Sequence, residues 1–189
     1  YYAHPQRRET YVNFLRNANF VLTPSQYFAD YIRANFSQRV VYFPASVDFE
    51  LVSPTPRPLR EDGPLIIGYE GTSKPEDFAP VVPALKRILN EFGDKVKLHF
   101  HGFLPSGFER HPRVEHVQMN SDYRAFLRNL DECAWDIGLA PLGDNLFNNC
   151  KTNNKFREYS ACYIPGVYSQ SPVYSNWVVH GETGISVAQ

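Results

Sequence analysis

Residues 65–75 read LIIGYEGTSKP, a short apolar run that leads into a loop rich in small and polar residues. After this loop, residues 78–92 carry apolar side chains at the spacing of one helix face, and residues 96–101 form a second strand-like run. A strand, a helix and a strand in this order predict a right-handed crossover between two parallel strands. This unit decides the fold class.

The same alternation continues toward the C-terminus. Strand-like runs occur at residues 114–117, 136–140 and 166–169, and helical patterns occur at residues 122–130 and 153–161. Strands that alternate with helices imply a mostly parallel sheet. We therefore predict an α/β fold in which residues 63–189 form a Rossmann-like parallel sheet with helices on both faces.

A smaller unit precedes this domain. An apolar run at residues 20–23 is followed by Pro24 and Ser25, then by a helical pattern that reaches Phe36 and a strand-like run at residues 40–43. Proline and turn residues then crowd together at Pro54, Pro56, Pro58, Asp62, Gly63 and Pro64. Such a cluster is typical of a linker. We place the domain boundary near residue 62 and expect residues 1–62 to close an N-terminal domain.

The composition excludes several classes of partner. With 19 basic and 20 acidic residues among 189, the chain has no charge excess that would hold nucleic acid or anionic lipid broadly. No apolar run reaches the roughly eighteen residues of a membrane span, and the first residues lack the apolar stretch of a signal peptide. We expect a cytoplasmic protein, which could act at the membrane surface, without an integral membrane segment. Cys133, Cys150 and Cys162 are far apart, so we expect reduced thiols.

Two loops are the places to search for a ligand, because parallel sheets bind ligands at the carboxyl ends of their strands. In the first loop, Gly71, Thr72 and Ser73 would bring backbone amides and hydroxyls near a diphosphate, and Lys74 would neutralise its charge. Such a turn is common in proteins, so this interpretation depends on the fold around it.

The second loop, residues 143–154, leads into a helix with Thr152 or Asn153 as its N-cap. Lys151 and Lys155 then lie where the helix dipole is positive, which costs about 0.3–1 kcal/mol for each exposed charge. A phosphate bound by the amides of Thr152 to Asn154, with the lysines around it, would remove this conflict. The alternative is that both lysines point into solvent.

Further along, the segment from Glu158 through Cys162 to Pro165 resembles glycosyltransferase family 4 and its relatives. Their C-terminal domain has a helix that begins with Glu, runs through small residues and Cys, and ends in Pro before the next strand. Residues 135–142 are similar to the family's strand before the donor loop, and residues 43–48 are similar to its interdomain segment. Residues 180–184 are similar to its closing turn.

This resemblance implies a GT-B fold, of which residues 63–189 would be the C-terminal, nucleotide-sugar-binding domain, truncated at its C-terminus. It implies that Glu158 is the second acid of the family's Glu-x7-Glu pair and binds the ribose of the donor. A carboxylate suits this role because it can accept from both vicinal hydroxyls. The first acid of the pair would fall at Cys150, where this sequence departs from the pattern. Either Asp144 supplies the carboxylate from the same loop, or the donor sugar is recognised differently.

The remaining site residues follow from the same resemblance. Lys151 and Lys155, with the helix amides, would carry catalysis by stabilising the departing diphosphate. Phe103 and Met119 would lie near the nucleotide base. The activity implied is transfer of a hexose from a nucleoside diphosphate sugar with retention. The acceptor, whether glycan, lipid or protein, is left open, as are the base and the sugar.

His99 and His101 lie two apart on a predicted strand and so on one face, and His111 and His116 follow. This cluster could bind a metal, but its spacing matches no zinc motif. We expect no metal and no cofactor besides the nucleotide sugar. Two other functions remain open, a non-catalytic binding module, which Cys150 favours, and a GT-B epimerase or hydrolase. We expect the isolated fragment to be inactive.

Overall fold

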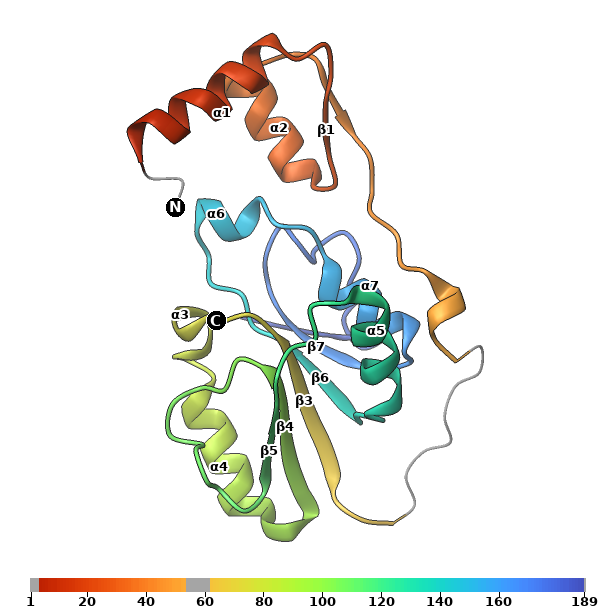
Figure 1. Cartoon of the computed structure of the whole chain (residues 1–189). Coiled ribbons are helices and arrows are strands. Elements are labelled where there is room, and N and C mark those ends of the chain that lie inside the picture. Colours follow the sequence, from red (N-terminus) through yellow and green to blue (C-terminus); the bar gives the residue numbers. More distant parts are fainter. Residues whose placement is uncertain (1–3, 54–61, 189) are drawn as a thin grey trace.

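The computed structural model describes residues 4–53 and 62–188, and its centre is a parallel sheet of six strands in the order β5-β4-β3-β6-β7-β8 (Figure 1). The strands are β3 (Leu65–Gly71), β4 (Val96–Gly102), β5 (Val114–Val117), β6 (Ile137–Ala140), β7 (Gly166–Ser169) and β8 (Ile185–Val187). β3 pairs with β4 over its whole length, so that Gly71 lies opposite Gly102 at the carboxyl ends.

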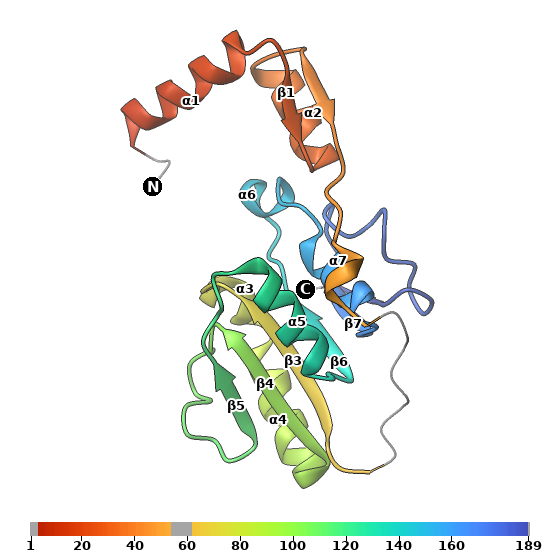
Figure 2. The ribbon, with the colours of Figure 1, turned by 45° about the vertical axis from the view of Figure 1, so that its right-hand side comes forward.

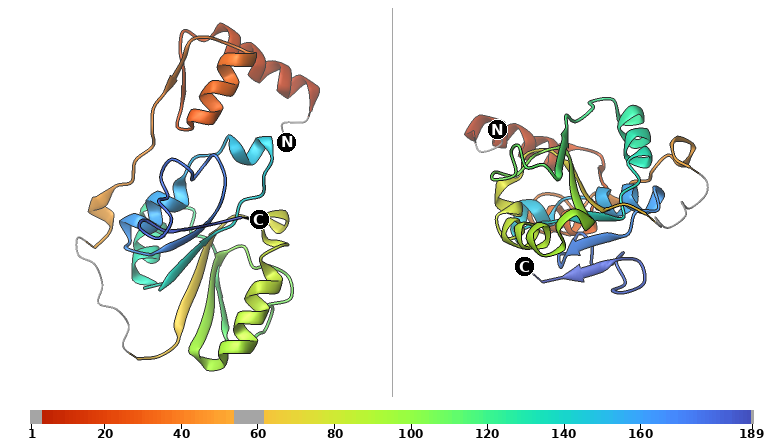
Figure 3. Two further views of the ribbon diagram at one scale, coloured as in Figure 1. Left: turned by 180° about the vertical axis from the view of Figure 1, so that it is seen from behind. Right: turned by 90° about the horizontal axis from the view of Figure 1, so that it is seen from below.

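Helices cover both faces of this sheet, as predicted. α4 (Val82–Phe92) packs Leu85 and Leu89 on one face, against a core that includes Leu98 and Phe100 of β4. α5 (Tyr123–Glu132) and α7 (Asn154–Ala161) pack on the other face, around a core that includes Trp135. Figure 3 shows α4 and α5 on opposite sides of the sheet. Because side chains alternate along a strand, His99 and His101 of β4 face away from α4.

The N-terminal part forms a separate small βαβ unit, seen at the top of Figures 1 and 2. β1 (Val21–Thr23) and β2 (Val40–Tyr42) pair in parallel, and α2 (Gln26–Asn35) connects them. The Ser25 side chain caps α2 by accepting a hydrogen bond from the amide of Phe28, as expected for serine at this position. α1 (Pro5–Asn17) precedes this unit and has no buried residue.

The predicted linker falls largely outside the described residues, because Pro54, Pro56 and Pro58 belong to the segment 54–61. The boundary near residue 62 therefore stays a prediction. On the N-terminal side of this segment, a short 3-10 helix η1 (Phe49–Leu51) places Leu51 in the same core as α5. In the described part of the chain, no helix has the length and the apolar character needed to cross a bilayer.

Several elements differ from the prediction. The helix expected over residues 78–92 is divided into α3 (Pro75–Phe78) and α4, with a short 3-10 helix η2 (Gly93–Lys95) after it. Proline has no backbone N–H to donate within a helix, and Pro80 lies between α3 and α4. Pro83 lies in the first turn of α4, where the N–H has no partner within the helix in any case. α1, α6 (Leu146–Asn149) and β8 were not predicted. α6 and β8 are only four and three residues long, too short for a periodic pattern of apolar residues to be visible.

Candidate functional site

A cavity of about 670 Å³ lies at the carboxyl end of the sheet, lined by the end of β3 and by residues that follow β5 and β6, where parallel sheets bind ligands. The N-terminal unit supplies part of its wall through Leu22, Thr23, Pro24 and Phe28. The sheet domain supplies the rest, which is formed by Glu70, Gly71, Thr72, Lys74, Met119, Asn120, Ser121, Tyr123, Phe126, Leu142, Cys150, Lys151, Thr152, Asn154, Lys155, Glu158 and Tyr174. We call this space the donor cavity.

A buried ion pair joins α7 to the end of β3 in this cavity. The Lys155 ammonium donates to the Glu70 carboxylate over 2.8 Å and to the Glu70 carbonyl. Both side chains are less than a tenth exposed. Lys155 Nζ also lies 4.8 Å from the centre of the Tyr69 ring. A buried charge has to be paired in this way, because an isolated one is strongly disfavoured.

Gly71 makes this close approach possible. Its φ angle is +149°, and a Cβ atom there would lie 2.5 Å from the Tyr69 hydroxyl and 3.1 Å from Lys155 Nζ. Any side chain would therefore disturb the ion pair and strain the backbone. The role of Gly71 at this site is to leave room for the lysine.

The positive charge of Lys155 at the N-terminus of α7, which is unfavourable to the helix dipole, is thus compensated within the protein. Glu70 supplies the anion that a first-turn lysine requires, so the alternative in which Lys155 points into solvent is wrong. The Asn153 side chain occupies the N-cap position of α7 without capping it. The first-turn amides of this helix are therefore not satisfied by that side chain and can serve an anion.

Lys151 is held by a second set of contacts. Its ammonium donates to the Asn148 side-chain oxygen and lies 4.7 Å from the centre of the Phe147 ring. Asn148 in turn donates to the buried carboxylate of Asp77, at 2.9 Å, and Asp77 also accepts from the Gly143 amide. This chain of hydrogen bonds fixes Lys151 on a short loop.

Lys74 completes a group of three cations around the cavity. Burial and the neighbouring ammonium groups of Lys155 and Lys151 lower the pKa of Lys74 to about 8. Burial also lowers the pKa of Lys151. All three lysines line the donor cavity, an arrangement that favours binding of an anion.

Glu158 lies one turn beyond Lys155 on α7 and is buried, with only 6% of its surface exposed. Burial, followed by the negative charge of Glu70, raises the pKa of Glu158 to about 7. Burial, followed by the negative charge of nearby Glu158, raises the pKa of the Tyr123 phenol to about 12. The cavity therefore contains a carboxyl group that changes its charge near neutral pH.

The structure brings most of the predicted site residues together and separates four of them. The predicted residues that line the donor cavity are Gly71, Thr72, Lys74, Met119, Lys151, Thr152, Asn154, Lys155 and Glu158. Ser73 and Asp144 are exposed outside it, and the Asp144 carboxylate accepts from the Asn149 amide. Phe103 packs in the core under α4, 5.5 Å from the Phe78 ring.

Asn153, the fourth of these residues, lines an adjoining cavity of about 480 Å³. Lys151 and Thr152 form part of the wall of both cavities. The adjoining cavity also includes the aromatic side chains of Tyr27 and Trp177.

Glu70 and Asp77 are two residues of this region that the sequence did not reveal. Glu70 is the one charged residue in β3, a strand that is otherwise apolar or glycine. A charge near the carboxyl end of a buried parallel strand is the signal that could have found it. Asp77 was missed in the same way, because its partners Gly143 and Asn148 are 66 and 71 residues away in the sequence.

Comparisons with known proteins agree on the fold. No protein-family model and no curated protein matches the sequence. Among solved structures, Anabaena HepE in complex with UDP-glucose matches with a TM-score of 0.69 at 15% identity, over 97% of this chain and 54% of that chain. Sucrose-phosphate synthase from Thermosynechococcus elongatus matches with a TM-score of 0.66 at 18% identity, over 97% and 48% of the two chains. The lipopolysaccharide outer core galactosyltransferase WaaB matches with a TM-score of 0.57 at 19% identity, over 90% and 49%.

The present chain spans about half the length of these three proteins. The match includes the small N-terminal unit as well as the sheet domain, because it extends over nearly the whole chain. All three solved structures are GT-B glycosyltransferases. The chain therefore has a GT-B glycosyltransferase-like fold.

Proposed function

We propose that this chain binds a nucleoside diphosphate sugar and that, in a longer protein, it forms the donor side of a retaining glycosyltransferase of the family 4 type. One observation carries the proposal. Three lysines and a buried glutamate, supplied by the loop after β3, the loop before α7 and α7 itself, line the same cavity, at the end of the sheet where nucleotides bind in this class of fold. The cations suit a diphosphate, and Glu158 suits the vicinal hydroxyls of a ribose.

The three lysines would have different roles. Lys74 and Lys151 are only partly buried and can approach the diphosphate directly. Lys155 is committed to Glu70, so it would act as a positive charge beneath the phosphates and hold α7 in place. Positive charges fixed in advance around a departing diphosphate lower the barrier to transfer, because they need not reorganise during the reaction.

Recognition of the transferred sugar would differ from the family pattern. Cys150 lines the cavity at the position where the pattern has an acid, and a thiol is a weak hydrogen-bond partner. Asp144 lies outside the cavity, so Glu70 is the second acid within it. We propose that the sugar hydroxyls meet Glu70 and the backbone of Gly71 instead.

Transfer would require an acceptor-side wall that these 189 residues supply only in part. The chain spans 54% of HepE, which was solved with UDP-glucose, and donor and acceptor must be held together for reaction. We expect the isolated chain to bind donor without transferring its sugar. The acceptor would then be recognised mainly by residues outside this chain.

Calorimetric titration with UDP, GDP and UDP-glucose tests the binding, and UDP-glucose is the first donor to use because HepE was solved with it. Saturable binding of at least one of them supports the proposal, and binding of none overturns it. A parallel product assay separates the rival functions. Release of free glucose would indicate a hydrolase, conversion of UDP-glucose into an isomer would indicate an epimerase, and binding with neither reaction is the expected result.

A further inference from the structure

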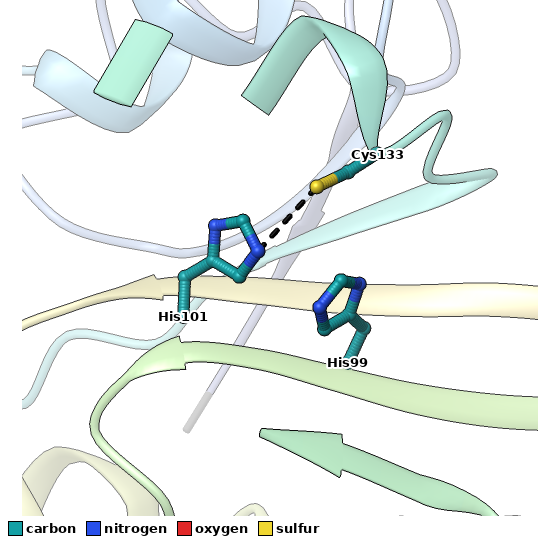
Figure 4. A group of neighbouring side chains, drawn as sticks. All are labelled: His99, His101 and Cys133. Atoms are coloured by element: carbon teal, nitrogen blue, oxygen red, sulfur yellow. Dashed lines mark hydrogen bonds between the residues drawn. The ribbon is translucent and has the colours of Figure 1, made fainter. Parts of the chain in front are cut away.

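Three side chains with metal-binding atoms meet on the face of the sheet that lies opposite α4. His99 and His101 come from β4, and Cys133 comes from the residue directly after α5. Their ligand atoms all lie within 4.8 Å of one another. Figure 4 shows the His101 ring directed at the Cys133 sulfur, with the His99 ring beside them. None of the three lines the donor cavity.

We propose that His99, His101 and Cys133 form a binding site for a zinc ion. Two imidazoles and a thiolate are a ligand set that zinc prefers, and they disfavour magnesium and calcium, which prefer oxygen. Zinc with three protein ligands keeps a fourth position for water.

The distances fit a tetrahedral ion. Zinc lies about 2.3 Å from sulfur and about 2.0–2.1 Å from imidazole nitrogen, so two such ligands are roughly 3.5 Å apart at a tetrahedral angle. His101 Nε2 lies 3.4 Å from Cys133 Sγ. This pair therefore needs little movement to bind an ion. The ligand atoms of all three residues lie within 4.8 Å of one another, so His99 would have to move closer to complete a tetrahedral set.

Without a metal ion, the hydrogen bonds of the His99 ring are incomplete. The Trp135 indole donates to His99 Nδ1 over 3.1 Å, so Nε2 carries the ring proton. His99 Nε2 is buried and has no hydrogen-bond partner among the described residues. Coordination through Nε2 gives this buried atom a partner. It also moves the ring proton to Nδ1, where it faces the Trp135 N–H, so the bond from Trp135 is lost and the zinc–nitrogen bond has to outweigh that loss.

The sequence predicted no metal at this position because the histidines alone matched no zinc spacing. The fold changes the ligand set. His111 accepts from the Arg113 amide and His116 contacts the Gly102 carbonyl, so both belong to other contacts. Cys133 takes their place, 32 residues beyond His101 in the sequence. A bound ion would tie β4 to the end of α5 and so stabilise the domain.

The test uses the whole chain, stripped of metal with a chelator. Titration with zinc against a competing chelator should give one ion per chain and a higher melting temperature. Cobalt should give the absorption of a tetrahedral site with a thiolate-to-metal charge-transfer band. Cys133→Ser should abolish that band and weaken zinc binding more than tenfold, and His101→Asn should weaken it similarly.

Cys150→Ser is the matched control, because it removes another partly buried thiol and should leave metal binding unchanged. Equal loss in both cysteine variants, or a cobalt spectrum of the unmodified chain without a thiolate band, would overturn the proposal. The spectrum of the unmodified chain decides the question even if Cys133→Ser does not fold. UDP binding, measured separately, reports on the donor cavity alone.

Discussion

The Lys155 ammonium lies 2.8 Å from the Glu70 carboxylate, in a pair that connects the last large helix of the domain to its central strand. The two residues are 85 positions apart in the sequence. This pair determines which lysine of the donor cavity is structural and which lysines can meet a ligand.

We predict that Glu70→Gln destabilises the fold by about 3–5 kcal/mol, because it leaves the Lys155 charge buried without its partner. Urea unfolding measures this change. The control is Glu115→Gln, which breaks the exposed pair with Lys97 at 3.9 Å and should change the unfolding free energy by less than about 1 kcal/mol. The double variant Glu70→Gln/Lys155→Met should recover much of the loss, and equal effects in the two single variants would argue against a special role for the buried pair.

At pH 8, where the Glu158 carboxyl is mostly ionised, Glu158→Ala should weaken binding of a nucleoside diphosphate by roughly tenfold to a hundredfold, since hydrogen bonds to a charged group contribute about 1.5–3 kcal/mol. Calorimetric titration of both forms gives the ratio. Glu91→Ala, which removes an exposed carboxylate from α4, should leave the affinity unchanged. Equal affinities for Glu158→Ala and the unmodified chain would remove Glu158 from the binding site.

The raised pKa of Glu158 predicts a pH-dependent stability. Burial raises the pKa from 4.5 to about 7 in the folded chain, so the folded state holds this proton where the unfolded state has lost it. The contribution of Glu158 to stability is therefore full below about pH 4.5 and is lost as the pH rises to 7. Glu158→Gln cannot ionise, so it should be more stable than the unmodified chain at pH 8, by up to about 3 kcal/mol, and similar to it at pH 5. Thermal unfolding at the two pH values measures the difference, and a gain of equal size at both would show that ionisation of Glu158 is not its cause.

Lys151→Ala should reduce the affinity for UDP by about tenfold or more, because it removes a charge-assisted bond to phosphate and leaves the fold intact. Lys95→Ala serves as the control. It removes an exposed lysine that directly precedes β4, at the amino-terminal end of that strand and so away from the donor cavity. The loss in Lys151→Ala should be smaller for uridine than for UDP. A similar loss for both would show that Lys151 does not act on the phosphates.

Gly71→Ala should disturb both stability and binding, because its added methyl group would lie 2.5 Å from the Tyr69 hydroxyl in a backbone conformation that alanine rarely adopts. We expect a loss of at least about 1 kcal/mol in the unfolding free energy. Gly63→Ala, at a positive φ of 89° but with open space around it, separates backbone strain from steric contact. If Gly63→Ala were as harmful as Gly71→Ala, the strain alone would account for the effect.

The sequence was sufficient for the fold and for part of the site. Alternation of apolar runs located five of the six strands of the large sheet, because residues close in sequence determine that pattern. The two ligand loops followed from the same pattern, since parallel strands end at a common edge. Gly71, Lys74 and Lys151 were found in this way.

The pairs that define the site could not be found, because each depends on which distant segments the fold places together. For Lys155 the sequence left two alternatives, contact with a phosphate or exposure to solvent. The structure adds the Glu70 carboxylate as its partner. Phe103 was expected near the base, but the turn after β4 directs it into the core under α4. Cys133 joined the histidines only through the packing of α5 on β4.

Trp177 gives the chain an internal optical signal. The centre of its ring lies 6.3 Å from that of Phe156 on α7, and Trp177 is 41% exposed at the adjoining cavity, whereas Trp135, the other tryptophan, is 3% exposed in the core. One indole therefore senses solvent beside the start of α7, and the second provides a reference that solvent does not reach. Quenching by iodide should affect only the first, so occupancy of the neighbouring cavities can be followed by the fluorescence of the unlabelled protein.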